Sequence, residues 1–96
     1  MNLHHLINNQ QVKDIETHRL LSDKGSATLM SIKAGKVLRE HQSVSQAVLL
    51  LVSGKATYEE KDRVEELAES MDFVEIPPHV THKVTAAEDS LFLLIH

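Results

Sequence analysis

Turn-forming residues divide this sequence into short apolar segments about ten residues apart, and this spacing constrains the fold more than any other feature. The apolar segments are residues 27–32, 46–52, 73–76, 82–86 and 91–95. Segments this short, bounded by Gly or Pro and containing Val, Ile and Thr, favour buried strands over helices. Because Lys55–Glu59 follows Ser53-Gly54 at once, Ser53-Gly54 is predicted to be a tight hairpin turn. The pattern as a whole predicts an all-β sandwich or barrel.

One segment leaves two interpretations open at this level. Residues 59–71 are rich in strong helix formers, and local propensity alone indicates an amphipathic helix. Alternatively, Lys61-Asp62 is the tip of a hairpin, with Lys55–Glu60 as the outgoing strand and Arg63–Leu67 as the returning strand. In both cases the acidic side chains of this segment are expected to form a solvated face.

Composition restricts the classes of protein and partner that fit this chain. A length of 96 residues suits one domain. The net charge of -4, together with only three Gly, one Tyr and two Phe, argues against a nucleic-acid partner. The absence of cysteine excludes a disulfide framework and a thiolate nucleophile. No apolar run approaches the roughly 20 residues of a membrane span, so we expect no membrane partner and a cytoplasmic location.

Histidine, which can bind metals and transfer protons, is enriched in this chain, with seven residues. His41, His79 and His82 lie beside turn signals, where functional sites tend to form. The other four, which are expected at the surface, are His4, His5, His18 and His96.

The spacing of residues 35–54 and 71–82 carries a resemblance to a known family. Gly35 is followed by five residues, His41, Ser43 two positions later, Ala47 four after that, and Gly54 after six more residues. Residues 71–82 then end in an Ile-Pro-Pro-x-x-x-His run. Both stretches resemble the two motifs of the cupin family.

The resemblance covers roughly residues 27–96 and implies a cupin-type antiparallel β-barrel, or jelly roll. It divides the single domain, residues 1–96, into an N-terminal extension or edge strands over 1–26 and a barrel core over 27–96. It also favours the hairpin over the helix, because the family places a strand pair between its two motifs.

Family members that bind a metal use two His and one Glu from the first motif and one His from the second. Carried over to this chain, only His41 and His82 remain as ligand types, because Ser43 stands at the second His and Ala47 at the Glu. Met71 and His79 replace two glycines of the second motif. The resemblance therefore implies at most a weakly held divalent ion such as Zn, Ni, Fe or Mn, since a catalytic site needs about three protein ligands.

The barrel interior is the expected binding site. The residues predicted to line its pocket beside the two histidines are Ser43, Ala47, Leu49, Leu51, His79 and Val84. The favoured function is binding of a small molecule by a metal-poor barrel. Two alternatives remain: a metal-dependent enzyme of isomerase or dioxygenase type with an incomplete ligand set, and a sensory barrel that acts with a partner protein.

Two strands depart from the alternation that a barrel wall requires. Residues 47–52 and 91–95 are apolar at every position, so part of each must face outward. Exposed apolar side chains cost roughly 1.5–3 kcal/mol each relative to burial. We therefore expect a homodimer, with coverage by residues 3–7 of the same chain as the alternative.

Overall fold

Nine strands make up the regular structure of this protein in the computed structural model, which describes residues 14–21 and 25–96, with no side-chain positions for Leu21, Glu40 and His41. The strands are β1 (Ile15–Leu21), β2 (Ala27–Ile32), β3 (Val37–His41), β4 (Ala47–Ser53), β5 (Ala56–Glu60), β6 (Arg63–Leu67), β7 (Phe73–Ile76), β8 (His82–Ala86) and β9 (Ser90–Ile95). The prediction of an all-β chain is confirmed. The described residues include no helix, and so none that is long and apolar enough to cross a membrane.

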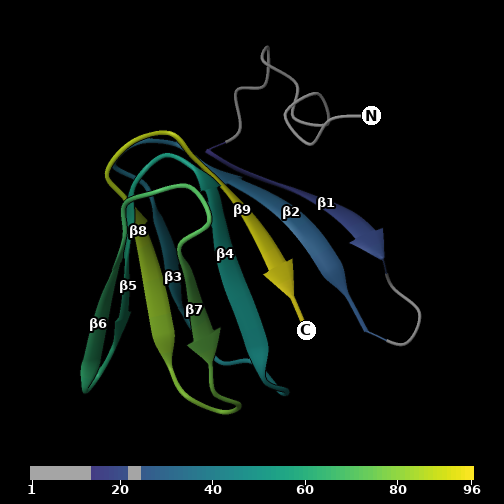
Figure 1. Cartoon of the computed structure of the whole chain (residues 1–96). Coiled ribbons are helices and arrows are strands. Elements are labelled where there is room, and N and C mark those ends of the chain that lie inside the picture. The colour runs from purple at the N-terminus through teal and green to yellow at the C-terminus, as the bar shows by residue number, and fades with distance from the viewer. Residues whose placement is uncertain (1–13, 22–24) are drawn as a thin grey trace.

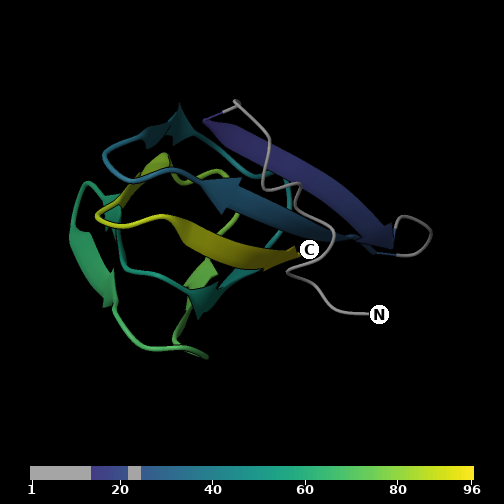
Figure 2. The same ribbon diagram turned by 90° about the horizontal axis from the view of Figure 1, so that it is seen from above.

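The strands form two antiparallel sheets that face each other (Figures 1 and 2). The five-stranded sheet has the order β1-β2-β9-β4-β7, and the four-stranded sheet has the order β3-β8-β5-β6. Neighbours in each sheet come from distant parts of the chain: β2 pairs with β9, and β3 pairs with β8. This arrangement of two packed sheets is the jelly roll that the sequence predicted.

The prediction of a tight hairpin at Ser53-Gly54 is wrong. The strand before it, β4, belongs to the five-stranded sheet, whereas β5 belongs to the four-stranded sheet, so the two strands do not pair. The turn instead carries the chain from one sheet to the other. Gly54 has a φ of +100°, and a Cβ there would collide with the Ser90 side chain and the Asp89 carbonyl oxygen. Close packing against the start of β9, and not a hairpin, is what requires glycine.

The second hairpin prediction is confirmed, and the helix is not formed. Ala56 to Glu60 pair with Leu67 to Arg63 in unbroken register around Lys61-Asp62. Ala56, Tyr58 and Leu67 are buried, as the two-residue period of a strand requires. Glu65 and Glu66 are tolerated because they lie at exposed positions of the edge strand β6, where tertiary pairing overrides propensity.

Two strands lie where the sequence showed no clear apolar segment. β1 falls in the region expected to hold an extension or edge strands, and it forms the edge of the five-stranded sheet beside β2. β3 forms an edge of the four-stranded sheet, with a register shift between Leu38 and His41. Edge strands carry more polar residues than central ones, which explains why pattern reading misses them.

The core lies between the sheets and is filled by alternate residues of each strand. Both sheets contribute to one cluster, whose buried members are Met30, Ile32, Ala47, Leu49, Leu51, Ala56, Tyr58, Leu67, Val74, Ile76, Val84, Ala86 and Phe92. Large side chains such as Tyr58 and Phe92 are fully buried there. The middle of the barrel is therefore packed with side chains, which leaves room for a site only toward its ends.

Candidate functional site

A cavity of about 240 Å³ opens at the end of the barrel where β7 and β9 finish and β4 and β8 begin. This is the lower end in Figure 1. The residues around it come from the β3–β4 loop and from four strand ends: Gln42, Ser43, Val44, Ala47, Ile76, His82, Leu94 and His96. Strand ends converge here because the two sheets splay apart past the packed core.

Three residues expected at the site from the sequence, Ser43, Ala47 and His82, line this cavity. Ala47 and His82 are buried at the first positions of β4 and β8. Ser43 lies in the loop after β3, because that strand ends at His41 and does not continue to Ser43. The two cupin-like motifs therefore meet at the same end of the barrel, although they are far apart in sequence.

Four other predicted positions take different places. Leu49, Leu51 and Val84 point into the packed core and are at most 1% exposed, so they belong to the core and do not line the cavity. His79 lies in the exposed turn before β8, and its backbone amide donates to the carbonyl oxygen of Ser43 at 2.7 Å. The contribution of His79 to the cavity is thus to tie the loop of Ser43 in place.

Two side chains stand where the family motif has glycine, and both have the backbone conformation that glycine favours. Met71 has a φ of 81° and His79 a φ of 64°. Residues other than glycine pay roughly 1–2 kcal/mol in this left-handed region. The turns before β7 and β8 therefore keep the shape of the motif at a cost in stability.

The described side chains around the cavity do not make up a three-ligand metal site. His41 and His82 are register partners on β3 and β8. At the other two family positions, Ala47 has no donor atom and the hydroxyl of Ser43 donates to the carbonyl oxygen of Ser45 at 2.6 Å. Within residues 14–21 and 25–96, no three His, Asp or Glu side chains are grouped so that they could hold an ion. A site of three protein ligands is therefore not formed by the described side chains.

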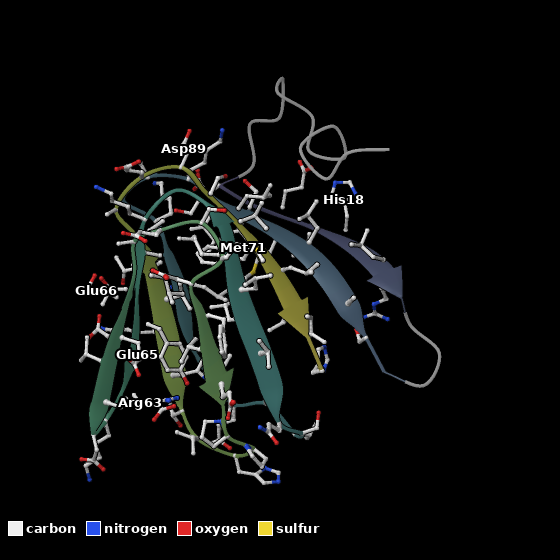
Figure 3. All side chains as sticks on the ribbon, viewed as in Figure 1. His18, Arg63, Glu65, Glu66, Met71 and Asp89 are labelled. Carbon is white, nitrogen blue, oxygen red and sulfur yellow. The ribbon has the colours of Figure 1, made fainter. Side chains whose placement is uncertain are left out.

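A partly buried polar cluster that the sequence did not indicate lies beside the cavity, between β5 and β6. The hydroxyl of Tyr58 donates to Oε2 of Glu60 at 2.5 Å, and Nη2 of Arg63 donates to the same oxygen at 2.6 Å. Nη2 of Arg63 also donates to the carbonyl oxygen of Glu75 on β7, at 2.6 Å. Figure 3 shows Arg63 near the tip of the hairpin, with Glu66 on its outer side. Arg63 thus links the edges of the two sheets.

The interactions of this cluster shift the pKa values of its members. Burial, followed by the hydrogen bond to Glu60, raises the pKa of Tyr58 to about 12. Burial acts to raise the pKa of Glu60 too, but the hydrogen bonds from Arg63 and Tyr58 outweigh it, so the pKa of Glu60 lies below its usual value. The cluster therefore holds a neutral phenol, a carboxylate and a guanidinium around neutral pH.

His82 connects the cavity to this cluster. Its ring is buried and stacks on Tyr58, with ring centroids 5.5 Å apart and an interplanar angle of 28°. Nδ1 lies 3.1 Å from the carbonyl oxygen of Val80, which assigns the proton to Nδ1 in the neutral ring. Glu60 is the register partner of both His82 and Arg63, so the three residues form one row across the four-stranded sheet.

The sequence assigned Glu60 to a solvated acidic face, and this is wrong. Its side chain is only 12% exposed and is bonded to both Tyr58 and Arg63. A signal was present, because pairing the two strands around Lys61-Asp62 places Glu60 opposite Arg63. The sequence did not show that β8 lies beside β5, and this pairing places His82 next to Glu60.

Comparison with known proteins places this architecture. No sequence-family model matches the chain, and no curated protein matches it in sequence. Solved structures match it closely. A cupin superfamily protein from Desulfitobacterium hafniense is 20% identical with a TM-score of 0.86, and the match covers 99% of this chain and 86% of that one.

Two other structural matches are proteins with specific names, KdgF and DMSP lyase DddQ. KdgF from Halomonas sp. is 23% identical with a TM-score of 0.80, over 95% of this chain and 86% of that one. DMSP lyase DddQ from Ruegeria pomeroyi is 16% identical with a TM-score of 0.79, over 93% of this chain and 49% of that one. With two sheets in jelly-roll order, two motifs meeting at one end and these structural neighbours, the chain has the cupin fold.

Proposed function

We propose that this protein binds a small organic molecule in the cavity at the open end of its barrel. The observation that carries the proposal is the cavity itself, walled on one side by the buried imidazole of His82 and elsewhere mainly by apolar side chains. A concave, mostly apolar pocket with a few convergent polar groups is the usual form of a small-molecule site.

The cavity volume limits the size of the ligand. At about 240 Å³ the cavity is smaller than the roughly 300–1,000 Å³ typical of sites for drug-sized molecules. An apolar cavity of about 150 Å³ accommodates benzene. The ligand is therefore about the size of one six-membered ring with a short substituent.

Blocking the cavity tests the proposal directly. We would titrate the ¹⁵N-labelled protein with a library of small fragments and follow the amide signals of residues 42–47, 76 and 82. Ser43→Phe places a ring in the cavity mouth and should abolish these shifts. Ser45→Phe is the matched control, because Ser45 lies in the same exposed loop and does not line the cavity. If no fragment shifts these signals, or if Ser43→Phe leaves binding unchanged, the proposal fails.

A weakly held divalent ion is a second candidate, favoured by the register pairing of His41 with His82. Two imidazoles are too few for a tightly held ion, so water would complete the coordination and a chelator should strip the metal. Elemental analysis of untagged protein equilibrated with Zn, Ni, Fe or Mn tests this. His82→Ala should abolish retention, and His18→Ala, on the far side of the molecule, should not. Undiminished retention in His82→Ala would move the site elsewhere.

Two further functions stay predictions. A metal-dependent enzyme of isomerase or dioxygenase type would need ligands at the positions of Ser43 and Ala47. A sensory barrel would act through a partner protein. The small number of metal ligands in the cavity favours simple binding over the metal-dependent enzyme, although one structural neighbour is named as a lyase.

A further inference from the structure

Among the residues that the structure describes, no side chain with a permanent charge lines the cavity. None of the eight residues around it is Lys, Arg, Asp or Glu. Val44, Ala47, Ile76 and Leu94 supply apolar surface. The described walls therefore offer a bound ligand the imidazoles of His82 and His96 but no carboxylate, ammonium or guanidinium side chain.

The polar groups of the loop are engaged within the protein. Nε2 of Gln42 donates to Oγ1 of Thr81 at 3.0 Å, and Oγ of Ser43 donates to the carbonyl oxygen of Ser45 at 2.6 Å. These bonds fix the loop that forms one wall. They also reduce the number of donors that could solvate an anion inside the cavity.

Glu60 and Arg63, two ionised groups near His82, are paired with each other. The carboxylate of Glu60 accepts hydrogen bonds from Arg63 and Tyr58, and the guanidinium of Arg63 also donates to the carbonyl oxygen of Glu75. The guanidinium carbon lies 5.2 Å from the centre of the Tyr58 ring. A pair that is bonded in this way is not available to pair with a ligand without breaking its own contacts.

Basic side chains gather in a different place. A larger surface cleft of about 790 Å³, formed where β1 and β3 begin, is lined by Lys36, Arg39 and Lys83 together with Asp14. Charged side chains therefore line the outer cleft, whereas the described residues that line the barrel mouth are uncharged or histidine.

We infer that the ligand of the barrel mouth is a small uncharged molecule with an apolar body, and that the cavity rejects anions and cations of the same size. The inference rests on the proposed function and adds the ligand class. Moving a charge from water into a site without a counter-ion costs far more than moving a neutral polar group. The apolar walls in turn reward burial of a ring or short alkyl chain.

Three probes of matched size test this inference: benzyl alcohol, benzoate and benzylamine. Each is titrated at pH 8, where an ordinary imidazole with a pKa of about 6.5 is neutral. Binding is measured from the amide shifts of residues 42–47, 76 and 82, with Ser43→Phe to show that the shifts report on the cavity. Benzyl alcohol should bind at least about tenfold more tightly than either ion.

The outcomes separate this inference from the proposed function. Equal affinity for the three probes, or tighter binding of benzoate or benzylamine, would overturn the inference while leaving a small-molecule site. Shifts that persist in Ser43→Phe, or a complete absence of shifts with all three probes, would overturn it as well. In the latter case the fragment library decides whether the proposed function survives, because it includes ligands outside the benzyl class.

Discussion

The two sheets of this barrel are built from different kinds of side chain on both of their faces. In the five-stranded sheet, β4 buries Ala47, Leu49 and Leu51 on its inner face and carries the half-buried Leu50 on its outer face. Phe73 and Ile95 extend this outer apolar surface and are 59% and 43% exposed. Apolar residues on both faces are expected only where both faces are covered.

The four-stranded sheet also buries apolar residues such as Tyr58 and Val84, but it differs at the cavity end of its inner face and on its outer face. Its inner face contains the polar row of His82, Glu60 and Arg63 beside the cavity. Its outer face carries polar side chains such as Thr57, whose hydroxyl bonds to Glu66. The outer apolar surface thus belongs to the five-stranded sheet, and the polar row beside the cavity belongs to the four-stranded sheet.

The outer face of the five-stranded sheet should hold two chains together, and we predict a homodimer. Leaving such a cluster in water costs roughly 1.5–3 kcal/mol for each large side chain. Sedimentation equilibrium at micromolar concentration should give twice the chain mass, and Leu50→Glu should give a monomer. Thr57→Glu, on the outer face of the other sheet, should stay dimeric. A wild-type monomer would indicate instead that residues 3–7, which lie outside the described residues, cover this face.

Inner and outer positions of β4 should differ in their contribution to stability. Leu51 is fully buried in the core, so Leu51→Ala should lower the free energy of unfolding by about 2–5 kcal/mol. Its neighbour Leu50 is only half-buried, and Leu50→Ala should cost clearly less. Urea unfolding at equal protein concentration measures both. Equal costs would mean that the outer face is packed as tightly as the core.

The polar row of the four-stranded sheet should make stability depend on acidity. Because the pKa of Glu60 is lowered in the folded protein, its carboxylate stabilises the fold above the ordinary Glu pKa of about 4.3. This contribution is lost as pH falls through the lowered pKa. Glu60→Gln should therefore cost about 1–3 kcal/mol at pH 7 and progressively less in acid.

Glu65→Gln is the matched control for this prediction, since Glu65 is an exposed residue of the same hairpin (Figure 3). Urea unfolding curves of the three proteins between pH 7 and pH 3 provide the measurement. If Glu60→Gln and Glu65→Gln have the same pH profile, the cluster does not stabilise the fold through its charge.

The strained turn that leads into the five-stranded sheet should be open to improvement. Met71 is exposed at a φ of 81°, at the end of the barrel opposite the cavity (Figure 3). Met71→Gly removes a backbone cost of roughly 1–2 kcal/mol. Part of this gain, about 0.5–1 kcal/mol, is lost again because glycine makes the unfolded chain more flexible. The net result should be a gain of about 0.5–1 kcal/mol in thermal or urea unfolding. Ser70→Gly, at an ordinary φ, should destabilise the protein instead.

Much of the fold could be predicted from local pattern. The strands over 27–32, 73–76 and 82–86 have the bounds that apolar runs and turn residues indicated, because both signals act within a few residues. The hairpin of β5 and β6 required more, since propensity favoured a helix and only the spacing between the two motifs indicated strands. Ser43, Ala47 and His82 at the cavity also follow from that spacing.

Tertiary structure alone decided which sheet each strand joins and which side chains meet across it. Ser53-Gly54 looks the same in sequence whether it closes a hairpin or crosses between sheets, and only the packing against Ser90 separates the two. Glu60 is half-buried and not fully solvated as expected, because β8 lies beside β5 and places His82 opposite it. Leu49, Leu51 and Val84 face inward as expected, but they pack in one core cluster with Tyr58 and Phe92 and do not line an open pocket. Burial and pairing depend on residues 20 or more positions away, and the local sequence does not show which distant residues will be neighbours.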